Sequence, residues 1–481
     1  MSPALRVRKC FVLAGLLCAM LCAFPAFIFA QTNGLQGGDL PLTGGLNGDQ
    51  VFPAAAFSTA GGFYLWHDNI TDPFGLGVSV QRLNAALAPE GPVLPVNQTT
   101  PLDQSRPKVA MLADGGAIAA WQSGRSGLQN VFARVINAAG SFAGNEVLMN
   151  NPALKVKNRY TAEWTLYRNN QPYTKLQTIN EKVSVRQDFN ANPSVSVLTD
   201  GSAVVTWGSS RVYETNTIQL QHWQTFKETK DGGFTILNHT KKVPVKIKVS
   251  GMQDVYAQRI SAAGVKLGGE FRVNIFSEFN QRDAAVSALE GGQFVVAWVS
   301  ERQRGTLPNI FARLFDAEGN GGAEFCVSTN ATTPCGSPTV TGTPGGGFTV
   351  AWVQNAIVRT NGMEIFARAF DATGAGVSAP FQANTFSYGD QFAPSIASLG
   401  TQQLLVWSSM GQDGSWEGVF AQALNGATKL GDEFRVNVAR AFSQKLPHVT
   451  SDGTGRALIL WSGYGPGGSG FDVFGRTYVA P

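Results

Sequence analysis

Histidine, cysteine and charged residues are scarce in this chain of 481 residues. Its four histidines never stand at the HxH or HExxH spacing of a zinc site. No GxSxG elbow, phosphate-binding loop or dinucleotide fingerprint occurs in the strand-to-helix context that these motifs require. The sequence therefore identifies no catalytic or metal-binding set, and we expect no cofactor.

Long apolar runs are confined to the beginning of the chain. Arg6, Arg8 and Lys9 precede an apolar segment that ends at Ala30, which is the pattern of a cleaved signal peptide. An uncleaved membrane anchor is the alternative, because the run approaches the length of a membrane span. No later segment has 18 consecutive apolar residues. We therefore expect a signal peptide at 1–30 and a secreted, periplasmic or cell-surface protein from 31 to 481 that is not an integral membrane protein.

Only two of the five cysteines lie outside this leader. Cys326 and Cys335 bracket a short polar segment, EFCVSTNATTPCGSP. In an exported protein, two cysteines that close such a loop are expected to form a disulfide. The alternative is a metal site, but the segment has no histidine and no second cysteine pair.

Tryptophan and glycine, in contrast, recur in a fixed pattern. Seven of the ten tryptophans end an apolar run that follows a Gly-rich turn, and their separations are 55, 86, 91, 54, 55 and 54 residues. One period of about 55 residues with two enlarged intervals predicts a repeat protein. We expect these side chains to form a structural core between neighbouring repeats: Trp66, Trp121, Trp207, Trp298, Trp352, Trp407 and Trp461.

A complete repeat contains four predicted strands. The first opens with proline in six of the seven repeats, with Ala284 as the exception, and the second ends at the tryptophan. The third has the form VFAR or VYAQR, and the fourth the form EFRVN. Four short strands at this period are typical of a β-propeller blade. The sequence therefore predicts an all-β, seven-bladed β-propeller, in which each strand-opening proline loses no ladder hydrogen bond.

These motifs also carry a family resemblance that covers nearly all of residues 36–481. EFRVN, a DQ dipeptide seven residues later, the apolar run ending in Trp and the VFAR strand resemble β-propeller repeats of large secreted or surface proteins of bacteria. The resemblance implies a propeller and an exported setting. That family has no established activity, so it assigns no catalytic residue.

The two ends of the chain complement each other. The seventh repeat stops after its third strand, whereas residues 37–43, GGDLPLT, align with the fourth-strand sequence GGEFRVN at 268–274. We therefore expect the N-terminal strand to complete the last blade. This pairing would close the ring and remove an exposed sheet edge.

Variation is concentrated on one predicted face. Loops between second and third strands, and those leading to the next blade, differ in length and sequence, which is where binding usually resides. Both enlarged intervals, about 151–191 and 208–253, belong to this face and read as β-hairpins that form a small annex on blade 3. Each holds seven basic against three acidic residues. This charge favours an anionic polymer, or simply keeps exposed strand edges soluble.

A few residues outside the repeat pattern are candidates for ligand binding. His67 and Asp68 follow the first repeat tryptophan and form either an acid–base pair or a loop cap. His448 is expected to face the central channel, and a packed or water-bridged role there is the alternative. Trp416 lies in a variable loop, while Trp164 and Trp223 lie in the annex. Exposed aromatic rings of this kind stack on sugars; for the two annex tryptophans, a place in the annex core is the alternative.

These observations favour a binding or scaffold module that engages a glycan or a surface protein through the variable face and the basic annex. We expect a monomer with no nucleic-acid partner. The first alternative is a carbohydrate-active hydrolase or lyase, by analogy with other propellers. The second is a structural part of an envelope assembly.

Overall fold

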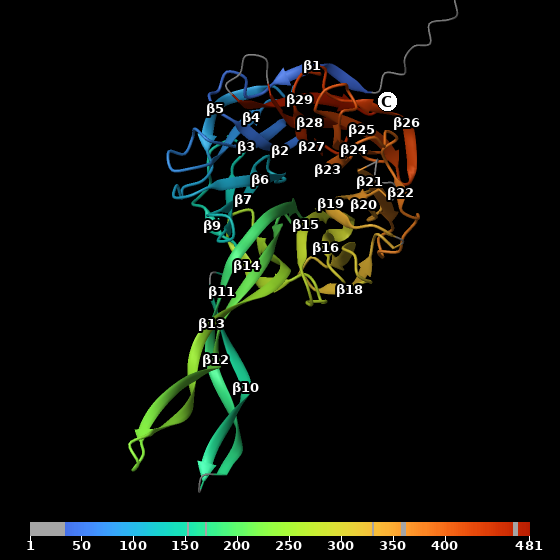
Figure 1. Ribbon diagram of the computed structural model, residues 1–481. Helices are drawn as coiled ribbons and strands as arrows, with labels where there is room; N and C mark the ends of the chain where they lie inside the picture. The colour runs from blue at the N-terminus through green and yellow to red at the C-terminus, as the bar shows by residue number, and fades with distance from the viewer. Residues whose placement is uncertain (1–33, 152, 169–170, 330, 357–361, 465–469) are drawn as a thin grey trace, which may run out of the picture.

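The computed structural model describes residues 34–481 apart from 152, 169–170, 330, 357–361 and 465–469, and for 153–188 and parts of 211–251 it describes the backbone alone. The predicted signal peptide lies outside the described residues. Seven antiparallel sheets surround a central hub (Figure 1). The innermost strand of each sheet contacts that of the next, and the seventh contacts the first. The predicted seven-bladed β-propeller is therefore confirmed.

The strands follow the blades in order, from the hub outward. Blade 1 comprises β2 (Gln50–Ser58), β3 (Gly61–Asp68), β4 (Gly77–Leu83) and β5 (Pro89–Pro95). Blade 2 comprises β6 (Gln104–Met111), β7 (Ala117–Ser123), β8 (Asn130–Ile136) and β9 (Val147–Leu148). Blade 3 comprises β11 (Gln171–Val197), β12 (Ala203–Glu228), β13 (Phe234–Ile260) and β14 (Lys266–Arg272), with β10 (Ala153–Arg168) paired to β11.

The second half of the ring repeats this order. Blade 4 comprises β15 (Gln281–Ala288), the 3-10 turn Glu290–Gly292, β16 (Phe294–Ser300), β17 (Asn309–Phe315) and β18 (Gly321–Cys326). Blade 5 comprises β19 (Cys335–Gly342), β20 (Phe348–Asn355), β21 (Met363–Phe370) and β22 (Phe381–Gln382). Blade 6 comprises β23 (Gln391–Ser398), β24 (Gln403–Met410), β25 (Glu417–Asn425) and β26 (Thr428–Arg435). Blade 7 comprises β27 (Gln444–Ser451), β28 (Arg456–Tyr464), β29 (Phe471–Val479) and β1 (Leu35–Pro41). In the described residues, no helix is long and apolar enough to cross a membrane.

The N-terminal strand closes the ring, as predicted. β1 pairs antiparallel with β29 at the edge of blade 7 (Figure 1). The backbone N–H of Leu42 continues the pairing by donating to the carbonyl of Val473 at 2.9 Å. Strands from opposite ends of the chain therefore share one sheet, which leaves β29 with no open edge.

The seven repeat tryptophans form the core between blades, also as predicted. All seven side chains have no solvent exposure. Trp121 of blade 2, for example, packs with Phe63 and Val78 of blade 1. Each large ring thus buries its area against the preceding blade, and hydrophobic burial of this kind fastens neighbouring sheets to each other.

A second repeated contact ties the outer strand of each blade to its third strand. The side chain at the end of the EFRVN motif, or its equivalent, accepts a hydrogen bond from a buried backbone N–H of the third strand at 2.7 to 2.9 Å in all seven blades. These side chains are Thr43, Asn97, Asn150, Asn274, Ser328, Asn384 and Asn437. The final residue of the motif is therefore explained by the scaffold.

The repeated prolines occupy a different place from the one predicted. They do not open the innermost strands. In blades 1, 2, 5, 6 and 7 the strand begins three residues earlier, as in β2 at Gln50 before Pro53, and in blade 3 β11 begins at Gln171. In every blade the pairing register shifts at this point. The proline therefore lies in a β-bulge, where its missing N–H removes no ladder hydrogen bond.

The annex on blade 3 is an extension of the blade itself. β11, β12 and β13 begin or end in the ring and continue without a break far beyond it, and Figure 1 shows them leaving the disc as an arm with β10 alongside. The two predicted hairpins are confirmed, since β10 pairs with β11 as far as Arg168↔Gln171 and β12 pairs with β13 as far as Glu228↔Phe234. The sequence placed them over blade 3, whereas the structure shows that they lengthen the strands of the blade.

The predicted disulfide is not present. Cys326 and Cys335 are both free thiols. Cys335 begins β19 at the position where most blades carry a buried glutamine or asparagine, and its sulfur lies 3.7 Å from Gln354 Oε1. The side chain is therefore directed into its own blade, and burial raises the pKa of this thiol to about 11. The loop-closing interpretation of the two cysteines was wrong because one of them is a repeat position.

The buried tryptophans give a direct test of this core. We expect Trp121→Ala to lower the free energy of unfolding by about 3 to 5 kcal/mol, because it leaves a large cavity between blades 1 and 2. Trp416→Ala is the matched control: this side chain is 68% exposed, and its loss should change stability by less than about 0.5 kcal/mol. Guanidinium denaturation measures both. Equal effects of the two substitutions would contradict the assignment of the repeat tryptophans to the core.

Candidate functional site

The mouth of the central channel is lined by one residue from each blade. These seven residues directly precede the bulge prolines or Ala284, and they line a cavity of about 580 Å³. All seven have backbone φ angles between 48° and 56°, although none is glycine. Such left-handed conformations are costly for ordinary residues and gather at functional sites. The seven residues, called the mouth ring below, are Phe52, Arg106, Asn192, Asp283, Ser337, Ala393 and Leu446.

Neighbouring blades support four members of the mouth ring. In each case the residue that follows the repeat tryptophan of the preceding blade accepts a hydrogen bond from the backbone N–H of the ring residue. His67 Nδ1 accepts from Arg106 at 3.3 Å, and Gln122 Oε1 accepts from Asn192 at 2.9 Å. In the same way, Ser408 Oγ accepts from Leu446 and Ser462 Oγ accepts from Phe52. The bulged backbone is therefore held by side chains across the blade boundary.

His67 has this supporting role in a buried environment. Its ring is 5% exposed and stacks on Phe52 with 5.1 Å between ring centroids. Burial, followed by the nearby Arg106 guanidinium, lowers the pKa of His67 to about 4. The imidazole is therefore neutral at pH 7, which is the state in which Nδ1 can accept the Arg106 hydrogen bond.

The Arg106 guanidinium lies over the Phe52 ring, on which His67 also stacks. Its central carbon is 4.9 Å from the centroid of the Phe52 ring, a cation–π contact. The side chain is exposed at the mouth, and among the described residues no carboxylate forms an ion pair with it. Phe52 and Arg106 together thus present an aromatic ring and a free cation to the channel.

The other charged member of the mouth ring is neutralised. Asp283 accepts a hydrogen bond from Asn192 Nδ2 at 2.9 Å and pairs with the Arg282 guanidinium at 2.7 Å. Arg282 also contacts Glu301 at 3.3 Å. Asp283 is therefore fixed in orientation, and Arg106 is the mouth-ring charge left for a ligand.

The mouth ring has two chemically distinct halves. Blades follow one another around the hub in chain order, so the polar residues of blades 2 to 5 form one arc. The residues of blades 6, 7 and 1 form an apolar arc made of Ala393, Leu446 and Phe52. A ligand at this mouth would meet hydrogen-bonding groups on one side and a hydrophobic surface on the other.

Sequence reasoning did not find this ring, although the signal was present. The residues on either side of each repeated proline change from blade to blade, whereas the proline itself recurs in six of the seven repeats. Variation on a fixed frame marks binding positions, just as it does in loops. The departure of the backbone into the left-handed region, which aims these side chains, is visible in the structure alone.

The structure separates the predicted pair His67 and Asp68. The Asp68 carboxylate accepts hydrogen bonds from Thr71 N and Ser79 Oγ at 2.6 and 2.7 Å, within its own hairpin. It therefore fixes the loop after β3, while His67 supports the mouth ring in the neighbouring blade. These contacts give both residues a structural role.

The other predicted residues lie in three places. His448 lines the channel below the mouth ring. Trp416 is exposed on the outer loop of blade 6. Trp164 and Trp223 belong to strands β10 and β12 of the arm, and their side chains lie outside the described part of the structure. Within that part, no three His, Cys, Asp or Glu side chains gather closely enough to hold a metal ion.

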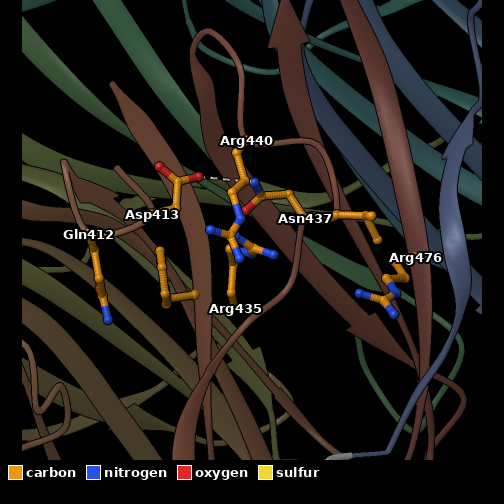
Figure 2. Close-up of a pocket in the computed structure, with 8 residues that line it drawn as sticks. Gln412, Asp413, Arg435, Asn437, Arg440 and Arg476 are labelled. Carbon is orange, nitrogen blue, oxygen red and sulfur yellow. Dashed lines mark hydrogen bonds between the residues drawn. The ribbon is translucent and has the colours of Figure 1, made fainter. Parts of the chain in front are cut away.

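A second cavity lies on the same face, at the boundary of blades 6 and 7. It measures about 540 Å³, and Figure 2 shows the arginines that line it, Arg435, Arg440 and Arg476. Asp413, also in its lining, accepts a hydrogen bond from Asn437 Nδ2 at 3.3 Å.

Two polar groups of this groove make contacts that recur around the ring. Arg476 donates to the Val436 carbonyl of the preceding blade at 2.7 Å, and Arg134, Arg313 and Arg368 make the equivalent contact at 2.7 to 3.0 Å. Asn437 accepts a hydrogen bond from the third strand, as Asn274 does in blade 3. The scaffold therefore explains both residues, and the channel mouth, where each blade differs, is the better candidate site.

Comparison with known proteins identifies no family for this chain. No family model matches the chain, and no curated protein matches its sequence. Among solved structures, polysaccharide lyase Uly1 is 10% identical, with 95% of this chain and 94% of that chain covered at a TM-score of 0.46. The NanB sialidase from Streptococcus pneumoniae is 7% identical, with 87% and 84% covered at 0.45. An alpha-L-arabinanase from Penicillium chrysogenum is 11% identical, with 92% and 96% covered at 0.40. Propellers host many unrelated functions, so this likeness carries no conclusion about what the chain binds or does.

The buried His67 predicts a specific sensitivity to acid. Because its pKa is about 4 in the folded protein and near 6.5 when unfolded, the unfolded chain takes up the proton first. Stability is therefore lost as the pH falls from 6.5 to 4, by on the order of 3 kcal/mol from this group. We expect His67→Gln to fold, since Gln122 makes the same contact in blade 2, and to lose less stability over this range. Denaturation at pH 7 and pH 4.5 measures the difference; parallel losses in both proteins would contradict it.

Proposed function

We propose that this protein is an exported carbohydrate-binding module that holds a sugar at the mouth of its central channel. The observation that carries the proposal is the two-sided mouth ring on a rigid frame. The cavity of about 580 Å³ lies within the range of about 300 to 1,000 Å³ that is typical of small-ligand sites.

A pyranose fits the chemistry of such a ring. Sugar rings carry C–H groups on their faces and hydroxyl groups around their edges. Ala393, Leu446 and Phe52 offer an apolar surface to the faces. The Phe52 ring is itself held in place by its contacts with His67 and Arg106. Arg106, Asn192 and Ser337 offer hydrogen-bonding groups to the hydroxyls.

The frame also favours binding. The mouth ring lies on the innermost strands of seven sheets that close on themselves, and support from His67, Gln122, Ser408 and Ser462 fixes its backbone. A site held in its bound geometry loses little conformational entropy when a ligand arrives.

The surroundings provide further contact surface. The signal-like leader supports an exported location, where polysaccharides and surface glycoproteins are available. Trp416 is exposed on the same face, and the two inserted segments of the arm are basic. We assign these features to secondary contacts with a longer glycan, around a primary site at the channel mouth.

A carbohydrate lyase is the second candidate function. The observation that favours it is Lys108, which lines the channel and whose pKa is lowered to about 8 by burial and then by Arg106. An amine that titrates near neutrality suits a general base. Hydrolysis has less support, because the common mechanisms use two carboxyl groups and Asp283 is the sole carboxylate among the described residues of the cavity lining.

Binding and turnover assays on an oligosaccharide panel test the proposal. We expect wild-type protein to bind at least one member without releasing product. Arg106→Ala should weaken binding roughly 10- to 100-fold, since it removes a charged hydrogen-bond donor. Arg125→Ala is the matched control, an exposed arginine of the same blade outside the channel, and should bind as wild type does. Titration calorimetry measures each affinity.

Three results would overturn parts of this proposal. Unchanged affinity in Arg106→Ala together with lost affinity in Trp416→Ala would move the site to the outer loop. Release of unsaturated sugar that disappears in Lys108→Met would establish the lyase instead. Absence of binding to every sugar on the panel would remove carbohydrate recognition altogether.

A further inference from the structure

Below the mouth ring, a second layer of side chains faces the channel. It consists of the residues that directly follow the bulge prolines or Ala284. Five of the seven are polar: Lys108, Ser194, Thr339, Ser395 and His448.

Three of these polar residues have a clear structural task. Ser194 Oγ accepts a hydrogen bond from the backbone N–H of Val286 in the next blade at 3.3 Å, and Ser395 Oγ accepts from Val449 at 3.1 Å. His448 Nδ1 accepts from Ala55 at 3.4 Å. The scaffold therefore uses this layer as a set of acceptors that join neighbouring innermost strands.

Lys108 cannot perform that task. An ammonium group has three donors and no acceptor, so it cannot receive the N–H of the next blade. Among the described residues, its Nζ has neither a hydrogen-bond nor an ion-pair partner. Hydrogen bonds to the next blade thus explain the two serines and the histidine of this layer, but they do not explain the lysine.

The charges around Lys108 leave its cation uncompensated. The other titratable groups that line the cavity are Arg106, Asp283 and His448. Arg106 repels Lys108, and Asp283 is already paired with Arg282. Burial and then the charge of Lys108 lower the pKa of His448 to about 3, so this ring is neutral. A partly enclosed cation without a counter-charge is unfavourable, and an anion in the channel would relieve it.

His448 adds a second donor beside this cation. Its Nδ1 accepts from Ala55, so the proton of the neutral ring is assigned to Nε2. No described residue receives that Nε2–H. Blades 2 and 7 flank blade 1, whose residue in this layer is the small Ala54, so the lysine and the histidine approach from either side of an alanine.

We propose that Lys108 and His448 form a carboxylate subsite below the mouth ring, so that the sugar recognised is a uronic acid. One carboxylate oxygen accepts from the Lys108 ammonium and the other from His448 Nε2–H, while the pyranose ring lies in the mouth ring above. Arg106, on the same strand as Lys108, adds to the attraction for an anion. This inference rests on the proposed carbohydrate-binding function and specifies its ligand class.

Uronic acid oligomers and their methyl esters provide the test, because the ester keeps the sugar and removes the charge. The probes are oligogalacturonate, oligoglucuronate and oligomannuronate, each with its methyl ester, and a sulfated oligosaccharide. We expect wild-type protein to bind one of the acids at least tenfold more tightly than its ester at pH 7. Lys108→Met should remove most of this preference, because it weakens binding of the acid far more than binding of the ester. Arg125→Met, an exposed charge deletion in the same blade, should retain the preference.

The pH dependence adds an independent readout. Lys108 holds a carboxylate while protonated, so affinity for the acid should fall as the pH rises from 7 through about 8 to 9. Affinity for the ester should stay constant in wild type, and affinity for both ligands should stay constant in Lys108→Met. Thermal unfolding at each pH confirms that the variants remain folded.

The outcomes distinguish this inference from the proposal on which it rests. Equal binding of acid and ester, or a preference that is undiminished in Lys108→Met, overturns the carboxylate subsite but leaves sugar binding intact. A preference for the sulfated probe over every uronate also overturns it. If no probe and no neutral sugar binds, the carbohydrate-binding function itself is wrong, and the subsite falls with it.

Discussion

Burial of one tryptophan at each blade boundary is the interaction on which the whole molecule depends. A single four-stranded sheet of this size has two faces and cannot cover both, so it is stable only between two neighbours. Each repeat tryptophan fills that boundary without any exposed surface. Because every blade needs a neighbour on both sides, the stack must close on itself, and the β1–β29 pairing supplies the closure. The channel exists because seven such boundaries surround a hub too wide for the backbone alone to fill.

The sequence predicted the parts of the structure that repeat. Trp66 and its six equivalents fix the number of blades, and the alignment of 37–43 with a fourth strand predicts how the ends meet. These predictions succeeded because each depends on a local sequence pattern that recurs in several repeats. The terminal residue of the EFRVN motif likewise has one contact in all seven blades, which explains why asparagine, serine or threonine stands there.

Predictions about single positions were less secure, for a physical reason. Cys326 and Cys335 looked like a loop pair because sequence spacing says nothing about side-chain direction, and Cys335 turns into its blade. His67 looked like a possible acid or base, whereas burial keeps it neutral and its hydrogen bond supports Arg106 in the next blade. The mouth ring was missed altogether. Its left-handed bulge before proline is a property of the folded backbone, and the residue types at these positions do not predict it. The inserted strands of blade 3 were recognised as β-structure, but whether they cap the blade or lengthen it depends on register.

The repeat also provides a way to separate scaffold from function at the remaining positions. In a ring of equivalent blades, a residue explained by the fold should have counterparts with the same contact. Arg476 passes this test, since three other arginines donate to the preceding blade in the same way. Ser194 and Ser395 pass it as well. Lys108 does not: three of its counterparts accept a hydrogen bond from the next blade, which an ammonium group cannot do. Partial desolvation makes a charge in the channel unfavourable, and the other six blades have no charged group at this position. The presence of Lys108 is therefore best explained by a ligand that enters the channel.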